Sequence, residues 1–329
     1  MADVARAAQV SLQTVSNTLN APERVRADTL ARVLDVIDRL GYQPNRAARS
    51  LRSRRTRHIG YRLDPDRSDT ASVLQDRFLH ALTTAAESAG YLVLLFSSGG
   101  TSAELTRYED MLRTGSVDGF VLSGIDPGDP RPAWLAERGA PFVCFGRLES
   151  DRADCLWVDV DGAAGTEAAV DHLVAAGHRE IGFLGWSGSS GPGEQRRRGW
   201  LRALQRHGLR PDHHVTALDT LADGTRAALE LLAGAPTITA IVAASDTFAL
   251  GCYAAARSVG LEIGRELAVI GVDDSPTASL VTPALTSVRQ PLEEVGKEVM
   301  NLLVARLSDQ NLQKTGILLA PSLVIRDSA

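Results

Sequence analysis

The chain is short of lysine, of cysteine and of long apolar runs. Only Lys297 and Lys314 are lysines, and neither lies in a glycine-rich loop, which excludes a P-loop phosphate site. The three cysteines, Cys144, Cys155 and Cys252, are scattered and odd in number, so we predict buried free thiols in a reducing compartment. No run of about 18 apolar residues is present, and the charged N-terminus is unlike a signal peptide, so neither a membrane span nor export is expected.

Signatures of enzymes are missing as well. A glycine-rich stretch from Gly182 to Gly193 follows a predicted strand, but it matches neither G-x-G-x-x-G nor G-x-S-x-G. His213 and His214 are adjacent, which is a poor spacing for ligands of one metal ion. No pair of carboxylates is marked as an acid/base dyad. We therefore expect no catalytic residues, no metal and no cofactor.

The charge is distributed unevenly along the chain. Residues 1–57 hold 11 Arg against 5 Asp and Glu, a net charge of +6. The rest holds 24 Lys and Arg against 35 Asp and Glu, a net charge of −11. A solvated helix face would account for isolated arginines, but less well for the six between Arg46 and Arg57. A basic head on an acidic body predicts that contact with a polyanion is confined to the head.

The head has the pattern of three short helices. Asp3 is placed to cap the first, and Ser11 to cap the second, which is predicted over Leu12–Leu19. The third is predicted over Thr29–Leu40, with Leu30, Val33, Leu34, Ile37 and Leu40 on one face, and Gly41 ends it. On the second helix Val15 and Leu19 face inward, while Gln13 and Asn17 share another face with Thr14 and Ser16 beside them. A helix that exposes amides and hydroxyls can read base edges in a major groove.

Many residues at fixed offsets in the head match a known family. They are Asp3-Val4-Ala5, Val10-Ser11, Thr14-Val15-Ser16, Asn20, Leu40-Gly41-Tyr42, Pro44-Asn45 and Ala48 to Leu51. This string resembles the head of the LacI/GalR family of bacterial transcription regulators, and the resemblance continues nearly to Arg326. The family often has Gly where this chain has Gln9, so a positive φ would strain that residue.

The resemblance implies a fold of two parts and a set of DNA contacts. It implies an all-α helix-turn-helix head over residues 1–44, a hinge helix and linker over 45–57, and an effector-binding and dimerisation body over 58–329. In the family the second helix enters the major groove, the hinge helix forms on DNA, and the leucine matching Leu51 wedges into the minor groove. The implied DNA-binding residues are Ser11, Leu12, Gln13, Thr14, Ser16, Asn17, Asn20, Asn45, Arg46, Ala48 and Leu51. Leu12 could instead belong to the core.

From His58 onward, short apolar runs alternate with helical stretches. The predicted strands are Ile59–Leu63, Tyr91–Phe96, Gly119–Leu122, Phe142–Phe145, Trp157–Val160, Glu180–Leu184, Ala240–Ala243 and Leu267–Val272. Such alternation predicts α/β lobes with parallel sheets covered on both faces. Two rounds of it resemble the periplasmic-binding-protein fold, with lobe 1 at about 58–157 and 289–315 and lobe 2 at about 158–288 and 316–329. By that analogy the chain crosses between the lobes near Val158, Arg289 and Gly316.

Ligands of such sheets bind beyond the carboxyl ends of the strands. The residues found there or at the crossings are Asp64, Arg147, Trp157, Asp159, Trp186, Arg196, Ser245, Asp246, Asp273 and Gln290. Carboxylates, an arginine and an amide suit the hydroxyls of a sugar. The resemblance marks Asp64, Arg196, Ser245 and Asp273 as effector contacts and places Thr220 near a position that is often aromatic. The effector-binding set therefore comprises Asp64, Arg147, Trp186, Arg196, Thr220, Ser245, Asp246, Asp273 and Gln290.

Several of these residues have a structural alternative. Asp246 and Asp273 could cap the helices that follow them. Trp186 could be a packing residue rather than a platform for stacking. Of Arg196, Arg197 and Arg198, one or two are expected to be simply solvated.

The function predicted is a cytoplasmic repressor that binds a palindromic operator and responds to a small molecule, which family prevalence makes a sugar or sugar derivative. A solute-binding protein of a transporter would share the body but would need an export signal and no head. A sugar-processing enzyme would need catalytic residues that the sequence does not offer. Because the printed sequence ends three residues after Arg326, without a leucine heptad, a homodimer is expected.

Overall fold

A computed structural model of the protein describes residues 1–42, 55–63, 71–147, 155–188, 191–310 and 316–329. Contacts divide the chain into two compact units, Met1–Thr56 and Arg57–Ala329. Each unit has its own hydrophobic core. Most of the predicted hinge segment, including Asn45, Arg46, Ala48 and Leu51, lies outside the described residues.

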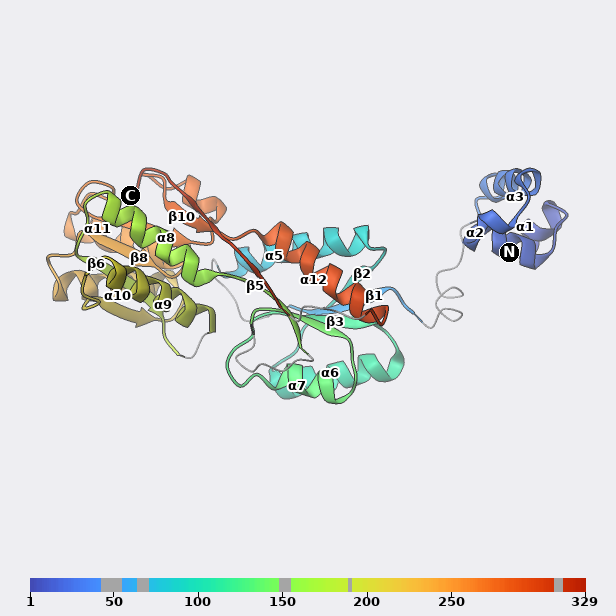
Figure 1. The fold of residues 1–329 in the computed structure, drawn as a ribbon, viewed down its shortest axis with the longest axis horizontal. Helices are drawn as coiled ribbons and strands as arrows, with labels where there is room; N and C mark the ends of the chain where they lie inside the picture. The colour runs from blue at the N-terminus through green and yellow to red at the C-terminus, as the bar shows by residue number, and fades with distance from the viewer. Residues whose placement is uncertain (43–54, 64–70, 148–154, 189–190, 311–315) are drawn as a thin grey trace. The chain divides into compact units, whose positions relative to one another are not determined.

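The N-terminal unit is helical, as predicted (Figure 1). Its elements are α1 (Ala2–Ala7), α2 (Leu12–Asn20), the 3-10 turn η1 (Pro22–Arg24) and α3 (Ala27–Arg39). Ser11 caps α2 through its side chain, which accepts from the backbone N–H of Thr14, so that prediction is confirmed. The prediction for Asp3 is wrong, because Met1 is the N-cap and Asp3 lies inside the first turn of α1. Gln9 has φ of 52° and Gly41 of 57°, as the turn and the helix end required.

The three helices enclose a small core. It is made of Val4, Ala5, Ala8, Val15, Val33 and Val36, with Val10, Leu19, Ile37 and Tyr42 packed against it. Leu34 and Leu40 were predicted to face inward, but they are 47% and 50% exposed. The buried stripe of α3 is narrower than the run of leucines suggested, because Val33 and Val36 already fill the contact with α1 and α2.

The body contains two six-stranded sheets, one in each lobe. The first sheet has the order β11-β5-β4-β3-β1-β2, formed by Gly316–Leu319, Leu156–Val160, Phe142–Phe145, Gly119–Leu122, His58–Arg62 and Leu92–Phe96. Helices α5 (Ala71–Ser88) and α12 (Leu292–Leu307) cover one face, and α6 (Thr101–Thr114) and α7 (Pro130–Glu137) cover the other (Figure 1). Every strand pair in this sheet is parallel.

The second sheet repeats this arrangement. Its order is β12-β10-β9-β8-β6-β7, formed by Ser322–Val324, Thr286–Arg289, Ala268–Val272, Ala240–Ala243, Ile181–Trp186 and His214–Ala217. Helices α8 (Gly162–Ala175) and α9 (Gly191–Arg206) pack on each other, as do α10 (Leu221–Gly234) and α11 (Asp246–Val259). The edge strand β12 runs antiparallel to β10, unlike its counterpart β11 in the first sheet.

Two of the three crossings between the lobes lie at other residues than predicted. Residues 156–160 all belong to β5 of the first sheet, so the first crossing follows Val160 rather than Val158. Strand β11 pairs in parallel with β5, so the last crossing follows Leu319 rather than Gly316. Helix α12 and strand β7 were not predicted from the sequence. The local sequence pattern does not show that a strand pairs in parallel with another strand more than 150 residues away. The positions of the crossings could therefore be located only in the assembled sheet.

Candidate functional site

A cavity of about 300 Å³ lies between the two lobes, beyond the carboxyl ends of the parallel strands. Its wall includes residues from β1, β4, β5 and α5 of the first lobe and from β6, β9, β10 and α9 of the second. Its volume is at the lower end of the range for small-molecule sites. The predicted residues Trp186, Arg196 and Gln290 all line it.

Arg196 lies at the centre of the lobe 2 wall. Its guanidinium donates to the backbone carbonyl of Ala244 and, at 3.4 Å, to Oδ1 of Asp273. It lies over the indole of Trp186, 4.8 Å from the ring centroid. The side chain is buried, so it is held in a single place rather than solvated. Its neighbours Arg197 and Arg198 instead pair with Glu194 on the helix surface.

Close packing of two helices holds Arg196 in place. Gly199 on α9 leaves room for α8, because a Cβ at Gly199 would stand 2.2 Å from the carbonyl oxygen of Ala163. The hydroxyl of Thr166 on α8 donates to the backbone carbonyl of Arg196 at 2.8 Å. Gly162 likewise leaves space for the stem of Arg196, whose Cγ would be 3.3 Å from an added Cβ. The direction of the guanidinium therefore depends on small residues of α8.

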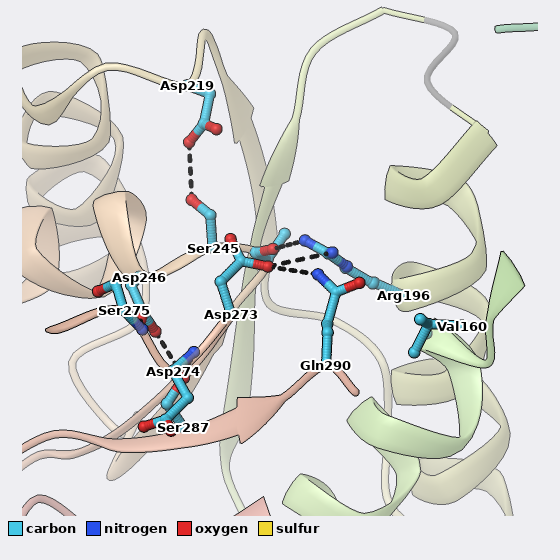
Figure 2. A network of polar contacts seen from close by, with 12 residues as sticks. Val160, Arg196, Asp219, Ser245, Asp246, Asp273, Asp274, Ser275, Ser287 and Gln290 are labelled. Atoms are coloured by element: carbon cyan, nitrogen blue, oxygen red, sulfur yellow. Dashed lines mark hydrogen bonds and ion pairs between the residues drawn. The ribbon is translucent and has the colours of Figure 1, made fainter. Parts of the chain in front are cut away.

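Asp273 joins Arg196 to the second predicted polar residue, Gln290 (Figure 2). Its Oδ1 accepts from Nε2 of Gln290 at 2.7 Å as well as from Arg196. Asp273 does not line the cavity itself, but its two partners do. Burial raises the pKa of Asp273 to about 7, and the charge of Arg196 opposes that rise. At neutral pH the carboxyl group therefore exchanges between its two protonation states.

The turn that carries Asp273 has an unusual backbone. Asp273 has φ of 110° and Asp274 has φ of 47°, both in the region that favours glycine. The Asp274 carboxylate accepts from Arg289 and Arg326 at 2.6 Å each, and its N–H donates to the hydroxyl of Ser287. These contacts stabilise the strained conformation, as is common at functional sites.

Asp246 is a structural residue in this neighbourhood (Figure 2). Its carboxylate accepts from the N–H of Ser275 and from the hydroxyl of Ser287, both at 2.6 Å. It does not line the cavity between the lobes, and burial raises its pKa. Neither Asp246 nor Asp273 caps a helix, so that alternative is wrong: Ser245 caps α11 and Ser275 precedes η2 (Pro276–Ser279).

The remaining predicted effector residues either are not part of the cavity wall or lie outside the described residues. Ser245 is occupied as a helix cap and donates to Asp219 at 2.7 Å. Thr220 caps α10 and bonds to Asp223. Arg147 lies beside the cavity, with its Nε 3.7 Å from Oδ2 of Asp159. Asp64 lies outside the described residues. None of the three described residues is in the cavity wall.

The structure adds wall residues that were not in the predicted set. Tyr61, Phe78 and Phe145 come from lobe 1, and Phe78 and Phe145 have ring centroids 4.6 Å apart. Asp159 is the last polar residue of β5, and its Oδ2 accepts from Nε2 of Gln195 in lobe 2 at 3.2 Å. The strand-end rule had marked Asp159 as a crossing residue. Nothing local marked Phe78 or Gln195, which reach the cavity from helices.

Arg62 enters the cavity wall from the end of β1. Its Nε is 3.3 Å from Oε2 of Glu104, a carboxylate that is almost completely buried. Glu104 also accepts from Arg131 and from the hydroxyl of Tyr108. Burial and the neighbouring Glu104 carboxylate raise the pKa of Tyr108 well above its ordinary value. Arg131 in turn pairs with Asp129 at 2.6 Å, so two cations meet two carboxylates.

A second contact joins the lobes at the strained turn. Nη1 of Arg77 on α5 donates to the carbonyl oxygens of Asp273 and Asp274, at 3.1 Å each. Together with the bond from Gln195 to Asp159, it ties lobe 1 to lobe 2 on either side of the cavity. A ligand that changed the position of Asp273 would also act on this contact.

In the head, α2 presents a polar face. Leu12 is 55% exposed and therefore not a core residue, and Gln13 is exposed one turn from Asn17. Nε2 of Gln13 donates to Oδ1 of Asn17 at 2.9 Å, so the two amides form one unit. Ser16 was expected beside them but is buried. Ser11 and Thr14 lie at the start of the helix with their hydroxyls 2.9 Å apart.

Two negative findings concern the described part of the chain. It contains no group of three or more His, Cys, Asp or Glu residues that could hold a metal ion. It also contains no helix that is both long and apolar enough to cross a bilayer. The three cysteines are free and buried, as predicted.

Comparisons with known proteins agree with this architecture. The family model of bacterial regulatory proteins, lacI family, matches residues 1–45, and that of the periplasmic binding protein-like domain matches residues 170–329. The HTH-type transcriptional regulator CelR of Thermobifida fusca is 32% identical over 329 residues, which cover 99% of this chain and 96% of CelR.

Solved structures match over the same length. The CelR–cellobiose complex has a TM-score of 0.77 at 29% identity, covering 99% of this chain and 98% of that one. The lac repressor dimer bound to operator and the anti-inducer ONPF has a TM-score of 0.82 at 28% identity, with 99% and 97% covered. These relatives are regulators of transcription rather than enzymes. With 32% identity carried along nearly the whole of a curated relative, the chain belongs to the lacI family of bacterial regulatory proteins.

Proposed function

We propose that this regulator is a cytoplasmic homodimer that represses transcription from a palindromic operator and changes its DNA affinity when a sugar enters the cavity between its lobes. The cluster of Arg196, Asp273 and Gln290 carries the proposal. It joins a cation, a carboxyl group and an amide at one wall of a cavity whose opposite wall includes three aromatic rings. Hydroxyls can bond to the polar wall while the C–H faces of a sugar ring pack on the other.

The relatives support the nature of both ligands. The lac repressor structure holds operator DNA, and the CelR structure holds cellobiose. In the present chain α2 exposes a unit of Gln13 and Asn17, amides of the type that read adenine in the major groove. One such helix reads only a few base pairs, which favours two heads on a palindrome.

Sugar control requires that the lobes have more than one arrangement. The contacts of Arg77 with the Asp273–Asp274 turn and of Gln195 with Asp159 are few and polar, so they can be exchanged for contacts with a ligand. Coupling between the sugar site and the operator site is typically about 1–3 kcal/mol and is reciprocal. The operator must therefore change the sugar affinity by the same factor.

The experiment begins with the full-length protein and a random pool of DNA duplexes. We expect selection of a near-palindromic sequence whose binding weakens steeply with salt, because the basic head displaces counterions. The selected duplex is then titrated with protein in the presence of cellobiose, glucose, galactose or ribose. Absence of any selected sequence would refute the DNA-binding role, and operator affinity unmoved by every sugar would refute sugar control.

The reading face is tested by single substitutions in α2. Gln13→Ala or Asn17→Ala should change the preferred bases, at about 1–3 kcal/mol for each lost bidentate contact. Arg39→Ala on the exposed surface of α3 is the matched control and should leave the preferred sequence unchanged. If all three variants select the wild-type sequence, the face that carries Gln13 and Asn17 does not read the bases.

A further inference from the structure

The cations in the cavity wall already have carboxylate partners. Among the described residues that line the cavity, the cationic side chains are Arg62 and Arg196. Arg62 pairs with the buried Glu104 at 3.3 Å, and Arg196 pairs with Asp273 at 3.4 Å. Drawing Arg196 toward a phosphate would leave the buried Asp273 without its cation, which is strongly unfavourable. Drawing Arg62 away would leave the buried Glu104 with a single cation.

Behind Arg62 there is no excess of positive charge either. Glu104 is shared between Arg62 and Arg131, and Arg131 is also paired with Asp129. The group therefore contains two guanidinium groups and two carboxylates. Its charges are compensated within the protein, which is the condition under which buried ions are tolerated.

Carboxylate groups belong to the same wall. Asp159 lines the cavity with its side chain only 10% exposed, and its oxygens accept from the N–H of Val160 at 2.9 Å and from Gln195 at 3.2 Å. Its nearest cation, Arg147, is 3.7 Å away, is not part of the wall and is 38% exposed. Asp126 lines the cavity as well. Burial raises the pKa of Asp159, because the carboxylate loses hydration in the cavity wall.

Two of the helices that start at the cavity carry their own carboxylates. Gly162 lines the cavity at the start of α8, but Asp161 caps that helix through the N–H of Ala164. Pro192 lines the cavity at the start of α9, whose first turn contains Glu194. At these two ends a carboxylate of the protein already lies beside the partial positive charge, whereas α5 also starts at the cavity and has no acidic residue in its first turn.

The rest of the wall is uncharged, with polar groups such as Ser123 beside a set of aromatic rings. The rings of Tyr61 and Phe78 and that of Phe145 lie on the lobe 1 side. An ionised group placed against these rings loses its hydration, and the carboxylates of the wall would add repulsion to that loss. A hydroxyl loses much less and can donate to a carboxylate such as Asp159.

We propose that the cavity selects uncharged polyhydroxy sugars and rejects phosphorylated and carboxylated ones, with Asp159 as the residue that sets this discrimination. The proposal rests on the proposed function, namely that the effector is a sugar bound between the lobes. It narrows that function to one chemical class. The pair of Asp159 and Gln195 offers an acceptor and an amide to adjacent hydroxyls from opposite lobes.

The test uses matched pairs of sugars that differ by one charged group. Binding to the full-length protein is measured by calorimetry and by the shift in melting temperature for glucose, glucose 6-phosphate and glucuronate, for galactose and galactose 6-phosphate, and for cellobiose and cellobiose 6′-phosphate. We expect at least one uncharged member to bind, and each of its charged partners to bind at least about 10-fold more weakly, because among the described wall residues an added anion meets carboxylates and arginines that are already paired. Equal or tighter binding of a charged partner would overturn this proposal while leaving sugar control intact. If none of the sugars binds, the proposed function fails and this proposal fails with it.

Substitution at Asp159 separates its role from that of the cavity as a whole. Asp159→Asn should lower the affinity for the uncharged sugar roughly 10-fold, as expected for the loss of a hydrogen bond to a charged group. It should also reduce the ratio between the affinities for the uncharged sugar and for its charged partner. Asp110→Asn, on the exposed surface of α6, changes the net charge equally. It should leave the sugar affinity and the ratio of affinities as in the wild type. The melting temperature of each variant without ligand shows whether that variant is folded. Unchanged discrimination in a folded Asp159→Asn protein would refute the role of Asp159.

Discussion

The two lobes have the same strand order but supply different chemistry to the cavity between them. In lobe 1, strand ends and α5 contribute the rings of Tyr61, Phe78 and Phe145. In lobe 2, α9 and the turn after β9 contribute the polar cluster of Arg196 and Asp273. The difference shows that a repeated fold sets where a ligand lies, while the residues at the strand ends set what that ligand can be.

The lobes also differ in how their buried charges are used. In lobe 1 Glu104 and Arg131 are closed in a group that reaches the cavity wall through Arg62 and through the backbone carbonyls of Ser123 and Gly124. In lobe 2 Asp273 bonds directly to two residues of the cavity wall, and its turn is contacted by Arg77 from lobe 1. We therefore expect the Arg196 cluster of lobe 2 to contribute most to effector binding and the aromatic rings of lobe 1 to contribute least. The following predictions test this contrast, from the largest expected effect to the smallest.

Removal of Arg196 should have the largest effect. Arg196→Ala deletes charge-assisted hydrogen bonds worth about 1.5–3 kcal/mol, so effector affinity should fall roughly 10- to 100-fold while operator affinity without effector is kept. Arg198→Ala on the same helix is the control, since Arg198 is 61% exposed and pairs with Glu194. The readout is operator binding across an effector titration. If the effector concentration that gives half of the change in operator binding is the same for Arg196→Ala and the wild type, the cluster is not the effector site.

The raised pKa of Asp273, about 7 against an ordinary 3.8, predicts a pH dependence of stability. Between these values the folded state holds a proton that the unfolded state has lost. The free energy of unfolding should therefore fall as pH rises through this window, by at most about 1.4 kcal/mol per pH unit from this group. Below about pH 4 and above about pH 7 the contribution should be flat.

Asp273→Asn removes the titrating group and keeps an oxygen to accept from Arg196 and Gln290. Urea unfolding at several pH values between 4 and 8 should show a shallower slope for this variant than for the wild type. Other buried carboxyl groups, such as Asp246, remain in both proteins, so only the difference between the two slopes reports on Asp273. Identical slopes would show that Asp273 ionises in the folded protein with an ordinary pKa.

The smallest effect is expected in lobe 1. Phe145→Leu keeps an apolar side chain at the end of β4 but removes the ring pair with Phe78 and a platform for a sugar. Aromatic contacts contribute about 0.5–1.5 kcal/mol, so effector affinity should fall by roughly 2- to 12-fold in calorimetry. A loss as large as that of Arg196→Ala would contradict the contrast between the lobes.

Local pattern was sufficient for much of the architecture. Alternation of apolar runs with helical stretches predicted parallel sheets in two lobes, and the cap at Ser11 and the end at Gly41 followed from residue type alone. Strand-end positions led to Asp273, Trp186 and Asp159, because ligands of parallel sheets bind where strands end. Such inferences work when a residue and its neighbours along the chain determine the outcome.

Contacts between distant residues decided the rest. No local signal could show that Gln195 reaches Asp159, that Arg62 is paired with a buried Glu104, or that β11 lies beside β5. The same holds for Asp246, whose place after a strand suggested a ligand contact, although packing turned it toward Ser275 and Ser287. The sequence by itself determined the class of fold, most of the elements and the family. Only the tertiary structure decided which charges are compensated, since that depends on side chains brought together from separate segments of the chain.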